Sequence, residues 1–165
     1  MKIALRIASI LSWFNLVFWA LILVIGLLNT VAVFNVSLLG GVVLLCSIPL
    51  NGYAAIQLHR AIRHPELKLS HHTPAGIRFV GMIAMFFGVL MVAYGVVILQ
   101  DTAGVLKLLK EQLPDNKDLF QVVTVDYLRR VGIFALVLGV AVIVNVILNM
   151  RLLRWYYLVK QSDVS

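Results

Sequence analysis

The fold is decided by residues 7–59, IASILSWFNLVFWALILVIGLLNTVAVFNVSLLGGVVLLCSIPLNGYAAIQLH, a stretch that contains no Asp, Glu, Lys or Arg. A bilayer core about 30 Å thick is crossed by roughly 20 apolar residues in an α-helix, which rises about 1.5 Å per residue. The stretch is therefore long enough for two membrane-spanning helices and the turn between them. Because a soluble domain of 165 residues could not bury so long an uncharged run, the sequence predicts an integral membrane protein.

Two further uncharged runs, residues 79–100 and 131–150, are each long enough to cross a membrane once. Only 13% of the residues are charged, about half the share found in soluble domains. Backbone groups exposed to lipid must bond within their own segment, and the runs do not alternate polar with apolar residues, so helices are expected rather than strands or a barrel. The predicted fold is all-α: a single transmembrane domain, residues 1–165, with four helices near 8–29, 36–59, 77–100 and 130–153.

The distribution of charge orients the predicted helices. Basic residues gather before the first helix, around the loop 60–76 and around the tail 154–165, where few acidic residues accompany them. The loop 101–129 is instead balanced in charge. By the positive-inside rule the first group faces the cytoplasm, so both termini are expected there, most simply in a bacterial inner membrane. Basic residues at a membrane surface attract anionic lipid headgroups by about 1 kcal/mol each, and scattered charges of this kind do not indicate nucleic-acid binding. The residues expected to contact headgroups are Arg60, Arg63, Lys68, Arg78, Arg151, Arg154 and Trp155.

Small residues recur every seven positions in three of the predicted helices. Such a period keeps one seam aligned along left-handed supercoiled helices, and small residues on a seam let two backbones approach closely. The pattern predicts a left-handed, antiparallel up-down four-helix bundle. Pro49 removes one backbone donor, so a kink is expected near it. The seam consists of Gly40, Ser47, Ala54, Gly81, Gly88, Gly95, Gly132 and Gly139.

Three predicted helices carry an asparagine at similar depth from the cytoplasmic boundary: Asn15, Asn51 and Asn145. An unpaired amide in hydrocarbon is costly, so these side chains are expected to face inward. Two interpretations are open. The asparagines are either interhelical hydrogen-bonding groups or the lining of a small polar pocket or ion vestibule. No ionisable residue is expected deep in any helix, which argues against a proton-coupled exchanger.

The predicted loops offer weaker signals. His59, His64, His71 and His72 lie close together in sequence, but their spacing suits a metal site poorly, and surface histidines without a joint role are expected. In the external loop, Leu106, Leu109 and Leu113 share one face of a predicted amphipathic helix over residues 102–113. Residues 120–125 fit either an extended segment or a further helix.

No catalytic set, cofactor motif or metal site is predicted. Cys46 is the only cysteine, which excludes an internal disulfide or a C-x-x-C redox pair. The first functional hypothesis is therefore a non-enzymatic membrane protein that self-associates or serves as an accessory subunit of a membrane complex. The alternatives are a homo-oligomeric channel with its path between subunits and, less favoured, a carrier or enzyme that acts on lipids.

Overall fold

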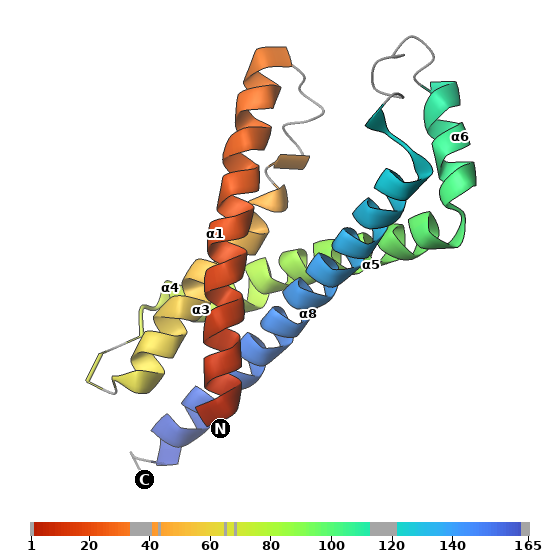
Figure 1. The fold of residues 1–165 in the computed structure, drawn as a ribbon. Coiled ribbons are helices and arrows are strands. Elements are labelled where there is room, and N and C mark those ends of the chain that lie inside the picture. The colour runs from red at the N-terminus through yellow and green to blue at the C-terminus, as the bar shows by residue number, and fades with distance from the viewer. Residues whose placement is uncertain are drawn as a thin grey trace. The chain divides into compact units, whose positions relative to one another are not determined.

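The structure, a computed structural model, describes residues 2–33, 41–42, 44–64, 66–67, 69–112 and 122–162. No strand occurs in these ranges, which confirms the prediction of an all-α chain. The four-helix membrane bundle as a whole stays a prediction. The elements, drawn in Figure 1, are α1 (Lys2–Val33), α3 (Ser47–Arg63), α4 (His72–Ala75), the π-helical turn η1 (Gly76–Val80), α5 (Gly81–Gln100), α6 (Thr102–Gln112) and α8 (Val125–Ser162).

Three stretches of the described chain are long and apolar enough to cross a membrane: Ile3–Leu28, His72–Gln100 and Val125–Val159. The shortest of them has 26 residues, which at about 1.5 Å per residue exceeds the thickness of a hydrocarbon core. The second stretch is continuous through α4, η1 and α5. These apolar helices suggest that the protein inserts into a membrane.

The predicted span 36–59 is described only in part, because residues 34–40 and 43 lie outside the described residues. Helix α3 begins at Ser47, directly after a turn at Cys46. Pro49 has no N–H to donate to the carbonyl of Leu45, which accounts for an interrupted helix at this point. The backbone N–H of Leu50 donates to the carbonyl of Cys46 over 3.1 Å and restarts the helical pattern.

The helices extend beyond the bounds expected from the apolar runs. Helix α8 begins at Val125 instead of 130, because the Thr124 hydroxyl accepts the N–H of Tyr127 over 3.2 Å and caps the helix. It then continues to Ser162, through most of the predicted tail. The third span begins at His72 instead of 77. Charged residues thus mark where the apolar surface ends, and the helical backbone continues past them.

Helix α6 covers the stretch that was predicted to form a short helix, except Leu113, which lies outside the described residues. The Asp101 carboxylate accepts the N–H of Gly104 over 2.8 Å and caps α6, while the Thr102 hydroxyl donates to the carbonyl of Ile98 over 2.7 Å. Of residues 120–125, only 120 and 121 lie outside the described residues; residues 123–124 are neither helix nor strand, and Val125 begins α8, so no continuous helix runs through this stretch into α8.

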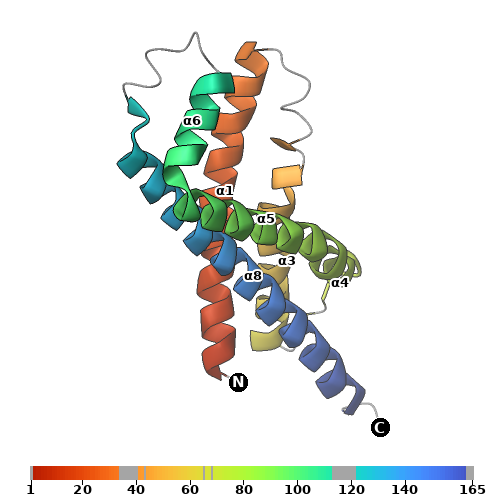
Figure 2. The same cartoon turned by 90° about the vertical axis from the view of Figure 1, so that its right-hand side faces the viewer.

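The chain forms two compact units, residues 1–87 with 142–165 and residues 88–141. In the first unit α1 and α3 run side by side in opposite directions (Figures 1 and 2). Their backbones come close at Gly52, where an added Cβ would lie 3.0 Å from the carbonyl oxygen of Ser12. The apolar core of this unit contains Ala8, Ala54, Leu58, Ile77, Leu152 and Leu153.

The second unit contains α6 and parts of α5 and α8, whose backbones meet at small residues. A Cβ added at Gly95 would lie 2.8 Å from the carbonyl oxygen of Gly132, and one added at Gly139 would lie 2.7 Å from that of Gly88. Neither approach leaves room for a methyl group. The seam residues of both units are buried wherever they are described, and Gly40 lies outside the described residues. The handedness of the bundle stays a prediction.

Candidate functional site

A layer of buried polar side chains lies inside the first unit. Helix α1 contributes Ser12 and Asn15, and α8 contributes Asn145 and Asn149. Residues three or four apart share one face of a helix, so each pair faces the same neighbours. Helix α3 adds Asn51 and His59. Each of these six side chains is at most 2% exposed.

Four of these residues form a continuous chain of hydrogen bonds across three helices. The Ser12 hydroxyl donates to the Asn145 amide oxygen over 2.9 Å. The Asn149 amide nitrogen donates to the same oxygen over 3.0 Å and lies 3.2 Å from the Ser12 hydroxyl oxygen. The Asn149 amide oxygen lies 2.9 Å from His59 Nε2. Asn149 therefore stands at the centre of this network, the Ser12–Asn145–Asn149–His59 chain.

The network fixes the tautomer of His59. Because an amide oxygen can only accept, Nε2 of His59 must carry the proton that it donates to Asn149. The other ring nitrogen, Nδ1, is then an acceptor, and it has no hydrogen-bond partner in the described chain. This tautomer suits a neutral ring held between helices.

The position of His59, which is only 2% exposed, corrects the expectation that the four histidines lie at the surface. Helix α3 continues to Arg63, and His59 lies on its buried face, one turn after the buried Ala55. The other three histidines are exposed. His64 Nδ1 lies 3.1 Å from a Glu66 carboxylate oxygen, and the rings of His71 and His72 are 6.0 Å apart.

The predicted asparagine layer is brought together only in part. Asn145 joins the network, whereas Asn51 has no partner for either amide atom and Asn15 has none for its amide oxygen within the described chain. Asn51 instead lies over α5, where an added Cβ at Gly81 would meet its oxygen at 3.0 Å. The layer predicted from the sequence included neither Asn149 nor Ser12. The spacing of Ser12 to Asn15 and of Asn145 to Asn149 was the signal that could have identified both.

Besides Asn15 and Asn51, other residues in and near the layer have buried polar atoms that form no hydrogen bond in the described chain. The side chains of Trp19 and Ser47, together with Nδ2 of Asn145, also have buried polar atoms without a partner in the described chain. Each such atom costs about 1–3 kcal/mol unless it gains a hydrogen bond. The layer therefore offers both donors and acceptors to a small polar species.

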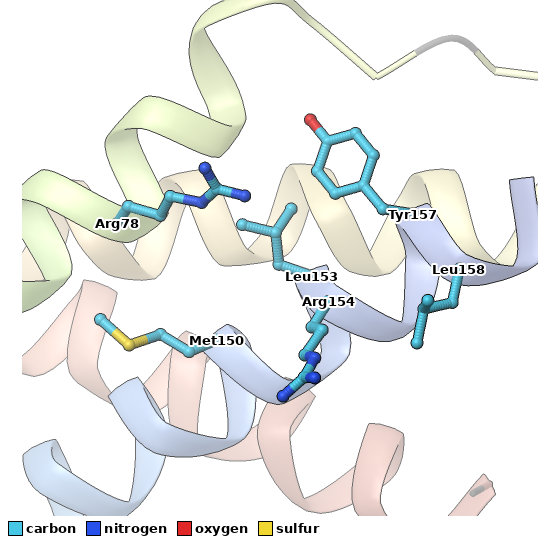
Figure 3. Close-up of a pocket in the computed structure, with 6 residues that line it drawn as sticks. All are labelled: Arg78, Met150, Leu153, Arg154, Tyr157 and Leu158. Carbon is cyan, nitrogen blue, oxygen red and sulfur yellow. The ribbon is translucent and has the colours of Figure 1, made fainter. Parts of the chain in front are cut away.

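The residues predicted to contact headgroups do not all lie together. Lys68 is outside the described residues, Trp155 is half-buried, and Arg60, Arg63 and Arg151 are exposed. Arg78 and Arg154, both exposed, line a common pocket in the first unit (Figure 3).

The network offers little for covalent catalysis. Ser12 donates to an amide oxygen, which cannot take up its proton, so its hydroxyl is not activated as a nucleophile. His59 is bonded to an amide and not to a hydroxyl or thiol. No three His, Cys, Asp or Glu side chains come together as a metal site in the described ranges. Neither a family model, nor a curated protein, nor a solved structure matches the chain.

Proposed function

We propose that this protein is a non-enzymatic, four-span integral membrane protein that self-associates or serves as an accessory subunit of a membrane complex. One observation carries the proposal: the Ser12–Asn145–Asn149–His59 chain directs the buried polar groups of three helices at one another. Interhelical hydrogen bonds of this kind hold membrane helices together. The main role of the polar layer is therefore to hold the helices together.

The proposed topology has both termini in the cytoplasm of a bacterial cell, in the inner membrane. Its support is the concentration of basic residues around the loop 60–76 and the tail 154–165, which the positive-inside rule assigns to the cytoplasm. The second of the four spans is the proposed helix over residues 36–59, of which the described part is helical apart from the turn at Cys46.

Association with a second protein would use the outer apolar faces. The described glycines of the seam lie against neighbours within the same chain, so they are not free to dimerise. The outer face of α1 instead exposes large side chains that include Trp13, Phe14, Val17 and Leu21. The rings of Phe14 and Phe18 stack 5.3 Å apart along this helix and form a rigid aromatic surface.

The experiment is to determine the stoichiometry of the full chain in lipid nanodiscs by single-molecule photobleaching. A dimer or larger assembly that Phe14→Ala with Val17→Ala dissociates supports association through α1. The matched control is Val137→Ala with Val140→Ala on α8, which removes apolar surface from another exposed helix face. A monomer that co-purifies with no membrane protein from its native host contradicts the proposal.

A homo-oligomeric channel is the second candidate function. The observation in its favour is the set of unpartnered buried amide atoms of Asn15, Asn51 and Asn145, which can replace part of the hydration of an ion or of water. Ion flux in proteoliposomes separates the two functions. Vesicles that stay impermeable to monovalent ions while the protein is folded and oligomeric contradict the channel and favour the accessory role.

A further inference from the structure

A basic pocket lies in the first unit, between the π-helical turn η1 and the C-terminal part of α8. Its volume is about 700 Å³, within the range of small-molecule sites. Figure 3 shows Arg78 and Tyr157 directed toward one another above Leu153, with Arg154 extending from the other side of α8. The residues that line the pocket are Arg78, Met150, Leu153, Arg154, Tyr157 and Leu158.

The two arginines of the pocket have no acidic partner among the described residues. The ion pairs found there join His64 to Glu66 and Lys107 to Glu111. A guanidinium group is always charged and presents its donors in a planar fork that matches the oxygens of a phosphate. Two guanidinium groups that line one pocket without a carboxylate partner among the described residues therefore favour an anionic ligand, and a phosphoryl group above all.

Apart from the hydroxyl of Tyr157 the remaining lining is apolar, which favours a lipid over a soluble anion as the ligand. Leu153, only 2% exposed, forms the floor, and Met150 and Leu158 extend the apolar wall along α8. A free phosphate would gain nothing from this surface. A phospholipid places a phosphate, a glycerol unit and the first acyl carbons next to one another, so it can contact the arginines and the apolar lining at the same time.

The pocket also lies where headgroups would lie if the apolar spans cross a bilayer. Arg78 follows the start of the span His72–Gln100 by about two helical turns, and Arg154 precedes the end of the span Val125–Val159 by little more than one. Trp155 and Tyr156 adjoin Arg154, and aromatic residues of this kind gather at membrane interfaces. Long arginine side chains reach from such positions to the phosphate level.

A second pocket of about 410 Å³ shares Arg78 and Tyr157 with the first and continues toward Ser70 and His71. The turn η1, which carries Arg78, is π-helical, and such turns often occur at functional sites. Ile77, the residue before Arg78, is fully buried in the core, so the turn is anchored where it presents the arginine. The polar extension gives room for the part of a headgroup beyond its phosphate.

We propose that this pocket binds one anionic glycerophospholipid, with its phosphate on Arg78 and Arg154 and its glycerol and upper acyl carbons on Met150, Leu153 and Leu158. The inference rests on insertion into a membrane, which the proposed function shares, and requires neither self-association nor a given orientation. Basic pockets between membrane helices are known sites for such headgroups.

The test is a native mass spectrometry titration of the delipidated full chain with phosphatidylglycerol, and with phosphatidylcholine of the same acyl chains. Arg78→Gln with Arg154→Gln is expected to weaken binding of the first phosphatidylglycerol by about 30-fold, at about fivefold for each charge. The matched control is Arg60→Gln with Arg151→Gln, which removes the same charge from two exposed arginines that do not line the pocket. We expect the control to lose less than about fivefold.

One further double variant and two competing ligands keep the result interpretable. Arg78→Lys with Arg154→Lys preserves the charge but removes the planar fork, so binding should fall several-fold while the fold is unaffected. Equal losses in the pocket pair and the control pair would show diffuse surface attraction and overturn the inference. Displacement of phosphatidylglycerol by millimolar inorganic phosphate would identify a soluble anion site instead, and equal binding of phosphatidylcholine would exclude charge recognition. The readout is lipid bound per chain, so an oligomeric or monomeric protein gives the same answer.

Discussion

Replacing Asn149 with leucine is expected to weaken the packing of α8 against α1 and α3 in the first unit. The substitution keeps the branched shape and the number of heavy atoms of the side chain and removes its contacts with Ser12, Asn145 and His59. Two of these contacts, with Ser12 and His59, join α8 to another helix, and hydrogen bonds between membrane helices average about 0.6 kcal/mol each, which gives about 1 kcal/mol for the two. The N–H of His59 Nε2 is then left buried without an acceptor, which adds about 1 kcal/mol more. The expected total is about 2 kcal/mol, or roughly a 30-fold change in the unfolding equilibrium.

The measurement is reversible unfolding of the full chain in mixed micelles, with helicity or tryptophan fluorescence as the signal. Asn51→Leu is the matched control, because Asn51 is equally buried but forms no hydrogen bond in the described chain. Removing two unpartnered polar atoms should leave stability unchanged or raise it slightly. A loss of stability in Asn51→Leu equal to that in Asn149→Leu would refute the reasoning, since it would show that burial and not hydrogen bonding determines the cost.

Three further outcomes are expected. Gly139→Ala should lower stability by about 1–3 kcal/mol in the same unfolding assay, because its Cβ would lie 2.7 Å from a carbonyl oxygen of α5, whereas Gly41→Ala, which meets nothing within 4 Å, should not. Asp101→Ala should cost α6 about 1 kcal/mol and speed amide exchange in its first turn, and unchanged exchange would show that the cap contributes nothing. In a cysteine-free background, a membrane-impermeant maleimide should label Lys107→Cys in intact cells and His64→Cys only after permeabilisation; the reverse pattern would invert the proposed topology.

The sequence was informative about helices because the uncharged runs are governed by one strong constraint. Hydrocarbon tolerates few charges and no unpaired backbone, so residues 79–100 and 131–150 could be recognised as helical without any knowledge of their neighbours. The ends of the helices followed other rules. Thr124 caps α8 well before the apolar run begins, and Ser162 lies well after it ends. The apolar residues of a helix indicate that lipid surrounds it, whereas the capping residues determine where it begins and ends.

The polar layer was less predictable because hydrogen-bond partners depend on rotation about each helix axis, which depth does not specify. Depth alone grouped Asn15, Asn51 and Asn145, but the structure pairs Asn145 with Ser12 and Asn149. His59, the last residue of the predicted helix near 36–59, was expected at the surface together with His64, His71 and His72. The side of α3 on which it lies decided its burial, and the small residues Gly52 and Ala55 on that side are what allow α1 and α3 to pack closely.

The asparagine layer had two interpretations: interhelical hydrogen bonding, or the lining of a polar pocket or ion vestibule. Each now depends on a different residue, so one pair of variants can separate them. Asn149 has its partners on α1 and α3 and accounts for interhelical hydrogen bonding. Asn51 has none within the described chain and is the asparagine on which a polar pocket or vestibule would depend. If the protein conducts ions, Asn51→Leu should abolish flux in proteoliposomes while its melting temperature is unchanged, because an apolar side chain offers no replacement for ion hydration. Flux that survives Asn51→Leu would exclude this residue from the path, and Asn51 would then be a buried amide whose cost the packing of α3 tolerates.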